Sequence, residues 1–344
     1  MEKLFYIGTY TEGTKSRGIY SAMINENGEV DGMATETNRT VVNPSYMAVN
    51  GDRLYAVEEC DAGSLVTFGI GDDGALTEIG RTNLPGSGYC HVTAYPDGKF
   101  VSASAYVSSG VSVCPVNFSG VAGDPVAGTA YEGKGKDKER QEAPHTHSSQ
   151  VTPNGKWLLV SDLGLDKIFI YESAPAGKDL KEHAVIEVEA GSGPRHFCFN
   201  EEGTKLYVLC ELSNRIFAYD FNAEKGSAEL IGSYSTLPEG FAGENTAADI
   251  HLSSNGNFLY ASNRGYDSIA VFQVLDDGKL QPADICKLDI KGPRSFAIVD
   301  IYMIIAGQVS NNVVVYRLNQ ENGKLRDRIS YISVPSPVCI CVKQ

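Results

Sequence analysis

Two stretches of the chain carry residue types that can do acid–base and anion chemistry. PHTHSSQVTPNGKWLLVSDLG contains His147, and GPRHFCFNEEGTKLYVLCELSN, one repeat later, contains Arg195 and Glu211. Both read as a short strand, a turn with glycine and a second apolar strand, so Arg195 aligns with His147 and Glu211 with Asp162. Imidazole can accept a proton from water near neutral pH, and guanidinium can hold an anion through two hydrogen bonds. The two stretches therefore predict one site, provided that the repeat is arranged around an axis.

The second strand of this repeat occurs seven times along the chain. Its copies are LFYIGT, LYAVEE, FVSASA, WLLVSD, LYVLCE, LYASNR and MIIAGQ, and their last residues follow one another at separations of 44 to 57 residues. This spacing is close to the period of propeller blades, each a four-stranded antiparallel sheet. A third strand follows each copy, and then a weaker fourth strand that carries charges, as expected at an exposed sheet edge.

The two ends of the chain predict how the ring closes. Six complete units start near Pro44, Tyr89, Thr146, Pro194, Ala247 and Pro293. Residues 336–342 read as an inner strand with nothing after it, and residues 4–9 as a second strand with nothing before it. We therefore predict an all-β, seven-bladed β-propeller with four antiparallel strands per blade, in which the N- and C-terminal strands share one blade. Residues 1–344 would form a single domain.

In a propeller the inner strands line the central channel. One set of inner-strand positions holds Ser45, Cys90, His147, Arg195, Ala248, Arg294 and Val338, and the ends of the second strands add Glu59, Asp162, Glu211, Arg264 and Gln308. The residues that follow the first set, which include His91, His196 and Asp249, point the other way in a regular strand. Each functional residue type is largely unique to its blade, which favours a site, whereas Arg–Glu pairs that merely join blades are the structural alternative.

The segment from Tyr131 to His147 is longer than its counterparts and densely charged. Such a run is usually a solvated loop. Because it leads directly into His145 and His147, we expect it to overhang a site. These two histidines lie on one face of a strand, but no third clustered ligand follows nearby, so we predict no metal and no other cofactor.

Composition excludes several classes of function. A formal net charge of −14 and a pI near 4.9 argue against a nucleic-acid partner. No apolar run is long enough for a membrane helix, the N-terminus reads directly as a strand, and the eight cysteines form no C-x-x-C pair. We therefore expect a cytoplasmic protein that contacts neither nucleic acid nor membrane; its oligomeric state stays open. The motifs of serine hydrolases, phosphate-binding loops and dinucleotide sites are absent from the sequence.

At these residues the chain resembles the lactonase family of seven-bladed propellers, which includes bacterial 6-phosphogluconolactonases and, more distantly, fungal carboxymuconate-lactonising enzymes. The resemblance is carried by FYIGTYT, APHTHSS, GPRHF, CEL, AADIHLSSNGNFLYASNRG and AGQ, in this order along the chain. It implies a catalytic His, Arg, Glu and second Arg at His147, Arg195, Glu211 and Arg264. We expect further substrate contacts from His91, His145, Asp249, Arg294 and Gln308.

The leading hypothesis is hydrolysis of a sugar-acid lactone, most naturally 6-phosphogluconolactone of the pentose phosphate pathway. The substrate would be a small anionic lactone, and His147 or Glu211 would activate water without a metal. Two alternatives stay open at this point: a muconate-type lactonising cycloisomerase that uses the same base and arginines, and a non-catalytic propeller that serves as a binding platform.

Overall fold

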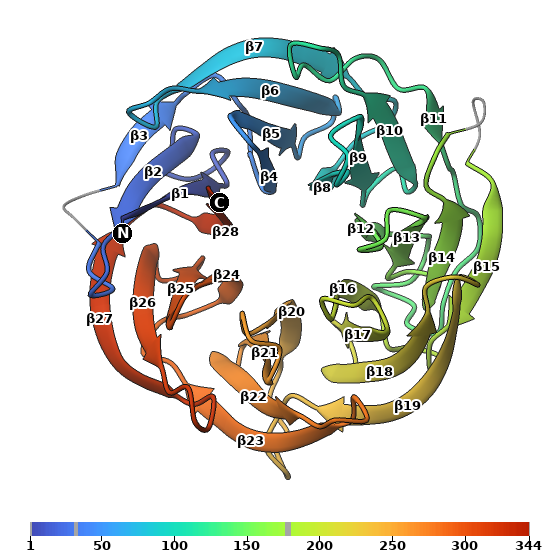
Figure 1. Ribbon diagram of the computed structural model, residues 1–344, viewed down its shortest axis with the longest axis vertical. Helices are drawn as coiled ribbons and strands as arrows, with labels where there is room; N and C mark the ends of the chain where they lie inside the picture. Colours follow the sequence, from blue (N-terminus) through green and yellow to red (C-terminus); the bar gives the residue numbers. More distant parts are fainter. Residues whose placement is uncertain (1, 31–33, 176–179, 344) are drawn as a thin grey trace.

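The computed structural model describes residues 2–30, 34–175 and 180–343. Within these residues all 28 elements are strands, and they form seven four-stranded antiparallel sheets. The sheets stand around a central axis as the blades of a ring (Figure 1). The predicted all-β, seven-bladed β-propeller is therefore confirmed. No helix in the described ranges is long and apolar enough to cross a membrane.

Each blade is built from the channel outward in chain order. The first three complete blades contain β4 (Met47–Asn50), β5 (Arg53–Glu58), β6 (Ser64–Ile70) and β7 (Leu76–Asn83); β8 (Tyr89–Ala94), β9 (Phe100–Ala105), β10 (Val111–Pro115) and β11 (Ala127–Gly128); and β12 (Thr146–Val151), β13 (Trp157–Asp162), β14 (Lys167–Glu172) and β15 (Glu182–Glu187). The next three contain β16 (Pro194–Phe199), β17 (Lys205–Cys210), β18 (Arg215–Asn222) and β19 (Ser227–Ser235); β20 (Thr246–Leu252), β21 (Phe258–Arg264), β22 (Ser268–Val274) and β23 (Leu280–Lys287); and β24 (Pro293–Val299), β25 (Tyr302–Gly307), β26 (Asn312–Leu318) and β27 (Leu325–Ser333).

The seventh blade joins the two ends of the chain, as predicted. The C-terminal strand β28 (Pro337–Val342) is its inner strand, followed outward by β1 (Lys3–Thr9), β2 (Ile19–Ile24) and β3 (Thr35–Asn38). The strands β28 and β1 run antiparallel, with Phe5 opposite Val342 and Ile7 opposite Ile340. The hydrogen bonds of this pair therefore close the ring.

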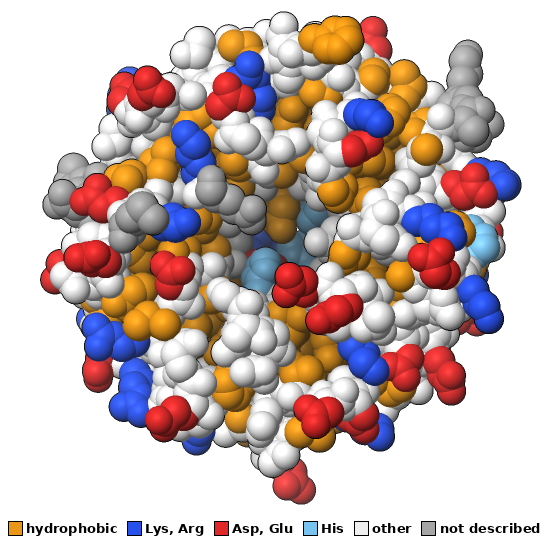
Figure 2. Space-filling view, in the orientation of Figure 1, with side chains coloured by type: hydrophobic (Ala, Val, Ile, Leu, Met, Phe, Trp, Pro, Cys, Tyr) orange, Lys and Arg blue, Asp and Glu red, His pale blue; other side chains and the backbone are white. Residues whose placement is uncertain are grey.

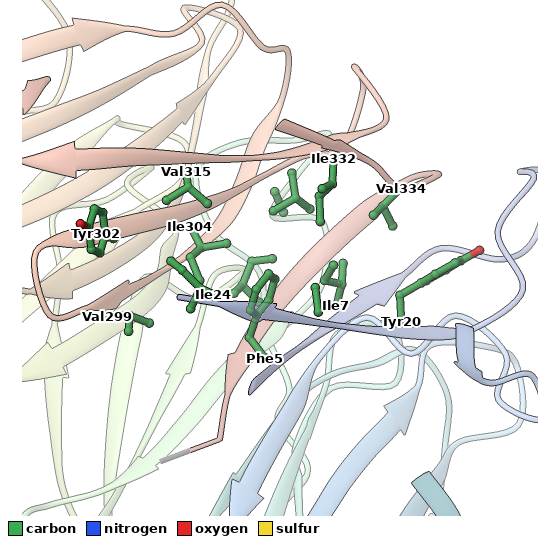
Figure 3. Packing of buried hydrophobic residues seen from close by; sticks show 14 residues of the cluster. Phe5, Ile7, Tyr20, Ile24, Val299, Tyr302, Ile304, Val315, Ile332 and Val334 are labelled. Atoms are coloured by element: carbon green, nitrogen blue, oxygen red, sulfur yellow. The ribbon is translucent and has the colours of Figure 1, made fainter. Parts of the chain in front are cut away.

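The core lies between neighbouring blades. The buried hydrophobic residues form seven clusters, and each cluster joins two adjacent sheets. On β1, Phe5 and Ile7 pack against the blade of β24, where Ile304 lies (Figure 3), whereas Tyr6 packs against the blade of β4. All three side chains of β1 are fully buried. Middle strands are apolar on both faces for this reason, and burial of each large side chain contributes about 1.5–3 kcal/mol.

The blade of β24 has a tight hairpin between its first two strands. Its strands β24 and β25 pair up to Val299 and Tyr302, which leaves only Asp300 and Ile301 in the turn. Asp300 has a φ of 52°, a left-handed conformation that a short polar side chain tolerates. The hairpin keeps Arg294 and Gln308 at one end of the blade, because Gln308 N donates to Gly292 O at 3.0 Å.

Candidate active site

A β-bulge near the start of most inner strands presents the channel residues. In the blade of β16, Pro194 pairs with Cys210 and His196 pairs with Leu209, so Arg195 has no residue opposite it. The register shifts at the equivalent place in β8, β12, β24 and β28. Such an extra residue bends a strand and re-aims its side chains. His147 and Arg294 occupy this position in their own blades.

The bulge overturns the alternation expected for a regular strand. Arg195 Nη1 lies 3.2 Å from His196 Nε2, so the side chains of two consecutive residues meet in the channel. His196 also lies edge-on to His147, with 5.3 Å between ring centroids. The expectation that the second residue of each pair points away from the first is therefore wrong at His196, because the extra residue interrupts the period of two.

Glu211 is the centre of a cluster of guanidinium groups. Its Oε2 accepts from Arg195 Nε at 2.9 Å and from Arg264 Nη2 at 3.0 Å, and its Oε1 accepts from Arg140 Nη2 at 2.7 Å. The glutamate is 4 % exposed. Burial by itself raises the pKa of Glu211, but the charges of Arg264, Arg195 and Arg140 outweigh it and lower the pKa from 4.5 to about 2. Glu211 is thus a firmly ionised anchor and a weak base.

Arg264 has one buried donor that the described residues leave unpaired. Arg264 Nη2 also donates to Ala247 O at 3.2 Å, but Arg264 Nε is buried and has no partner among the described residues. Burial, opposed by the charge of Glu211, lowers the pKa of Arg264 to about 10, so the side chain stays cationic at neutral pH. A buried donor without a partner is costly.

His147 is a buried, neutral imidazole. It is 5 % exposed, its Nδ1 lies 3.8 Å from Cys90 Sγ, and its ring meets Tyr106 edge-on at 5.6 Å. Burial, and then the nearby positive charge of Arg195, hold the pKa of His147 well below 6.5. The ring therefore carries a free lone pair at neutral pH and can accept a proton from a substrate or a water molecule.

The long charged segment does reach this cluster. Gln141 is fully buried, its Nε2 donates to Leu163 O at 2.8 Å, and its Oε1 accepts from Asp137 N at 2.9 Å. This buried anchor positions the neighbouring Arg140, whose side chain is 40 % exposed and contacts Glu211. His145 stacks on Tyr106 with 4.4 Å between ring centroids and reaches Glu142 Oε1 at 3.2 Å, so it fastens the end of the segment.

Arg294 belongs to a second polar chain at this end of the channel. Its Nη2 donates to Tyr10 OH at 2.8 Å, and Tyr10 OH in turn donates to the Glu59 carboxylate at 3.1 and 3.2 Å. Arg294 also lies over the Tyr10 ring, 5.3 Å from its centroid. Ser45, one of the predicted channel residues, has a buried hydroxyl without a partner among the described residues.

His91 and Asp249 lie elsewhere in the channel. His91 stacks on Tyr46 with 4.2 Å between ring centroids, and Asp249 pairs with His196 and His251. These side chains line a cavity of about 280 Å³ that extends to the far ends of the inner strands. Figure 2 shows histidine side chains inside the central hollow of the ring. The structure thus brings His147, Arg195, Glu211 and Arg264 together, and His91 and Asp249 join a separate group.

Several residues of the cluster were not predicted from the sequence. Arg140 was hidden within a charged run, and its only signal was that this run leads into His147. Tyr10 and Tyr106 each follow the last residue of a second strand and are aromatic, which alone does not distinguish them from core residues. Among the described residues, no group of three or more His, Cys, Asp or Glu side chains is placed to hold a metal ion.

Fold and site together define a class: a closed propeller with a buried imidazole and a cluster of arginines around a buried glutamate in its channel. The sequence profile of the family described as "Lactonase, 7-bladed beta-propeller" matches residues 4–342. The chain is 33 % identical to a 6-phosphogluconolactonase of Bacillus subtilis over 97 % of each chain, and 29 % identical to one of Yersinia pestis, also over 97 % of each. Its fold matches a periplasmic gluconolactonase of Pseudomonas aeruginosa with a TM-score of 0.92, 27 % identity and 99 % of both chains covered.

The chain therefore belongs to the lactonase family of seven-bladed β-propellers and is a lactone-hydrolysing enzyme. The resemblance noted in the sequence is confirmed, and hydrolysis is favoured over the cycloisomerase and binding-platform alternatives.

Proposed function

We propose that this enzyme hydrolyses 6-phosphogluconolactone to 6-phosphogluconate, a step of the pentose phosphate pathway, without a metal ion. The relatives from Bacillus subtilis and Yersinia pestis carry the name of this activity. One observation in the channel carries the proposal: a neutral His147 lies beside guanidinium groups that Glu211 holds in place. In a protein of net charge −14, this cluster is the natural anchor for an anionic substrate.

In the proposed mechanism His147 is the general base. It takes a proton from water as the water oxygen bonds to the lactone carbonyl carbon, and Arg195 and Arg264 hold the oxyanion that forms. When the tetrahedral intermediate collapses, the ring C–O bond breaks and the imidazolium returns the proton to the leaving alkoxide. The low pKa of His147 makes its conjugate acid a good proton donor for this second step.

Glu211 has a positioning role in this scheme. With a pKa of about 2 it is a poor base, and its two oxygens are already occupied by three guanidinium groups. We assign the remaining arginines to the substrate anion: Arg140 at the exposed edge of the cluster, and Arg294 opposite Tyr10. His145 and Gln308 at the same end complete the proposed substrate contacts.

The test compares proton release from phosphorylated and unphosphorylated gluconolactone, each with and without a chelator and corrected for spontaneous hydrolysis. We expect a higher kcat/KM for the phosphorylated lactone and no effect of the chelator. Equal rates on both lactones would refute the phosphate requirement, and a rate abolished by the chelator would refute the metal-independent mechanism. Loss of a muconate chromophore instead of lactone hydrolysis would favour the cycloisomerase. A cytoplasmic location stays a prediction.

A further inference from the structure

Asp249 receives an unusually complete set of hydrogen bonds. Its Oδ1 accepts from His196 Nδ1 at 2.9 Å and from Ile250 N at 3.1 Å, and its Oδ2 accepts from Phe296 N at 3.1 Å and lies 3.2 Å from His251 Nε2. Asp249 is 2 % exposed. Burial raises its pKa, but the neighbouring histidines and their hydrogen bonds outweigh burial and hold the pKa well below 3.8. The group is therefore an ionised carboxylate that can only accept hydrogen bonds.

This acceptor determines the tautomer of His196. Because Asp249 Oδ1 has no proton to give, His196 Nδ1 must carry one. Burial, and then the charge of Arg195, lower the pKa of His196 to about 4, so the ring carries a single proton at neutral pH. His196 Nε2 is then a lone pair, and it lies 3.2 Å from Arg195 Nη1, a group that can only donate.

The hydrogen bonds that run from Asp249 through His196 to Arg195, here called the relay, leave one end of Arg195 unoccupied. Arg195 Nε donates to Glu211, and Arg195 Nη1 donates to Ala248 O and to His196. Arg195 Nη2 has no hydrogen-bond partner among the described residues. The planar guanidinium is therefore fixed at two of its three nitrogens, and its orientation is determined from both sides of the channel.

We propose that Asp249 and His196 are positioning residues for the lactonase reaction: Asp249 sets the tautomer of His196, and His196 orients Arg195 so that Nη2 faces the substrate. This inference rests on the proposed function, because it supplies the reason for holding Arg195. It spans three consecutive blades, since His196 lies on β16, Asp249 on β20 and the Phe296 amide on β24. It also gives Asp249 a role other than the direct substrate contact expected from the sequence.

Two substitutions of His196 separate positioning from packing. H196Q keeps an acceptor near the position of Nε2, whereas H196N keeps a donor towards Asp249 and loses the group that faces Arg195. We expect H196Q to retain most of the activity and H196N to lose about 10- to 100-fold in kcat and in kcat/KM alike, as for an interaction that acts on the transition state. Similar activity in the two variants, at similar melting temperatures, would overturn the proposal.

D249N tests the tautomer itself. Its amide nitrogen can only donate, so whichever way the amide is turned, a donor meets either His196 Nδ1–H or the Phe296 amide. H251N is the matched control, because it removes another donor to Asp249 without touching Arg195. We expect D249N to lower kcat at least tenfold and H251N to lower it much less, because His196 and the backbone amides of Ile250 and Phe296 still donate to Asp249 in H251N. Equal losses in both would show a general effect of the buried carboxylate and overturn the relay.

Imidazole ¹⁵N NMR measures which nitrogen of His196 is protonated, independently of catalytic activity. The wild type should show His196 protonated at Nδ1, and D249N should show a different protonation pattern. A wild-type His196 protonated at Nε2 would overturn the inference even if the enzyme is fully active. Conversely, a wild type that hydrolyses no lactone would refute the proposed function, while the NMR result would still decide whether the relay exists.

Discussion

Replacement of Glu211 by glutamine removes one charge from a cluster that contains three arginines. Arg195 is 2 % exposed and the Arg264 side chain 16 %, so neither can turn into bulk water when its partner is lost. Both would then face each other as buried like charges, and Arg140 would lose its contact at the edge. E211Q therefore tests whether Glu211 organises the cluster, because the side chain keeps its size but loses its charge and one of its two acceptor oxygens.

Two independent values of the unfolding free energy lost in E211Q agree. Breaking a buried ion pair by removal of one partner costs about 3–5 kcal/mol. Independently, a pKa lowered from 4.5 to about 2 corresponds to about 3 kcal/mol of stability from the Glu211 carboxylate at pH 7. With an unfolding entropy of about 2.1 cal/mol/K per residue, 344 residues give about 0.7 kcal/mol/K. E211Q should thus melt about 4–7 °C below the wild type.

The stability that Glu211 contributes should depend on pH. Because the folded-state pKa of Glu211 is depressed, its contribution is complete above about pH 4.5 and is lost as the pH falls towards 2. The difference in unfolding free energy between wild type and E211Q should shrink to about 2 kcal/mol at pH 3.5. Calorimetry at pH 7 and denaturant unfolding at both pH values measure these quantities.

The matched control is E58Q. Glu58 is also buried and paired with an arginine, Arg81, but that pair does not join the Glu211 cluster. Both variants should lose stability, whereas only E211Q should also lose about 100-fold or more in kcat, since misplaced guanidinium groups no longer meet the transition state. An E211Q enzyme that melts with the wild type, or that keeps its turnover, would refute the anchoring role.

The site and the ring lead to four further predictions. H147A should lower kcat about 100- to 10,000-fold without unfolding the protein, whereas H183A, which replaces an exposed histidine, should leave kcat unchanged. The kcat/KM of the wild type should stay level from about pH 6.5 to 8, because the pKa of His147 is depressed. R140A should mainly raise KM, most strongly for the phosphorylated lactone, and equal KM values for both lactones would assign Arg140 to structure alone. Deletion of residues 337–344 should open the ring, and a truncated chain that melts at the intact protein's temperature would contradict both this closure and the single-domain organisation that we propose for residues 1–344.

The propeller could be predicted from the sequence because its strands obey local rules. Middle strands such as β1 are buried on both faces and read as continuous apolar runs, and the turns between them carry glycine at regular separations. The two incomplete units at the chain ends then determined the number of blades. The strand and turn signals are local in the sequence, and the repeat of 44 to 57 residues together with the two incomplete end units supplied the long-range part of the prediction.

The arrangement of the site depends on features that such rules do not contain. Asp162 and Glu211 align in the repeat, yet Asp162 accepts from His145 N and Thr146 Oγ1 at 3.0 and 2.9 Å and thereby holds its own blade end together. The side chain of Glu211 is one methylene longer than that of Asp162, and only Glu211 lies among arginines, which come from two blades and a loop. Whether a carboxylate closes a turn or anchors a cluster is therefore decided by neighbours that are distant in sequence.

The bulge at Arg195 matters for chemistry because it also lies outside these local rules. A regular inner strand would send Arg195 and His196 to opposite faces, and the relay from Asp249 could not reach the guanidinium. The extra residue costs one pairing in the ladder, but it lets consecutive side chains meet in the channel and links the Glu211 cluster to the histidines beyond it. Because the bulge recurs around the ring with different residues in most blades, one backbone irregularity presents an imidazole, two guanidinium groups and their hydrogen-bond partners to a single channel.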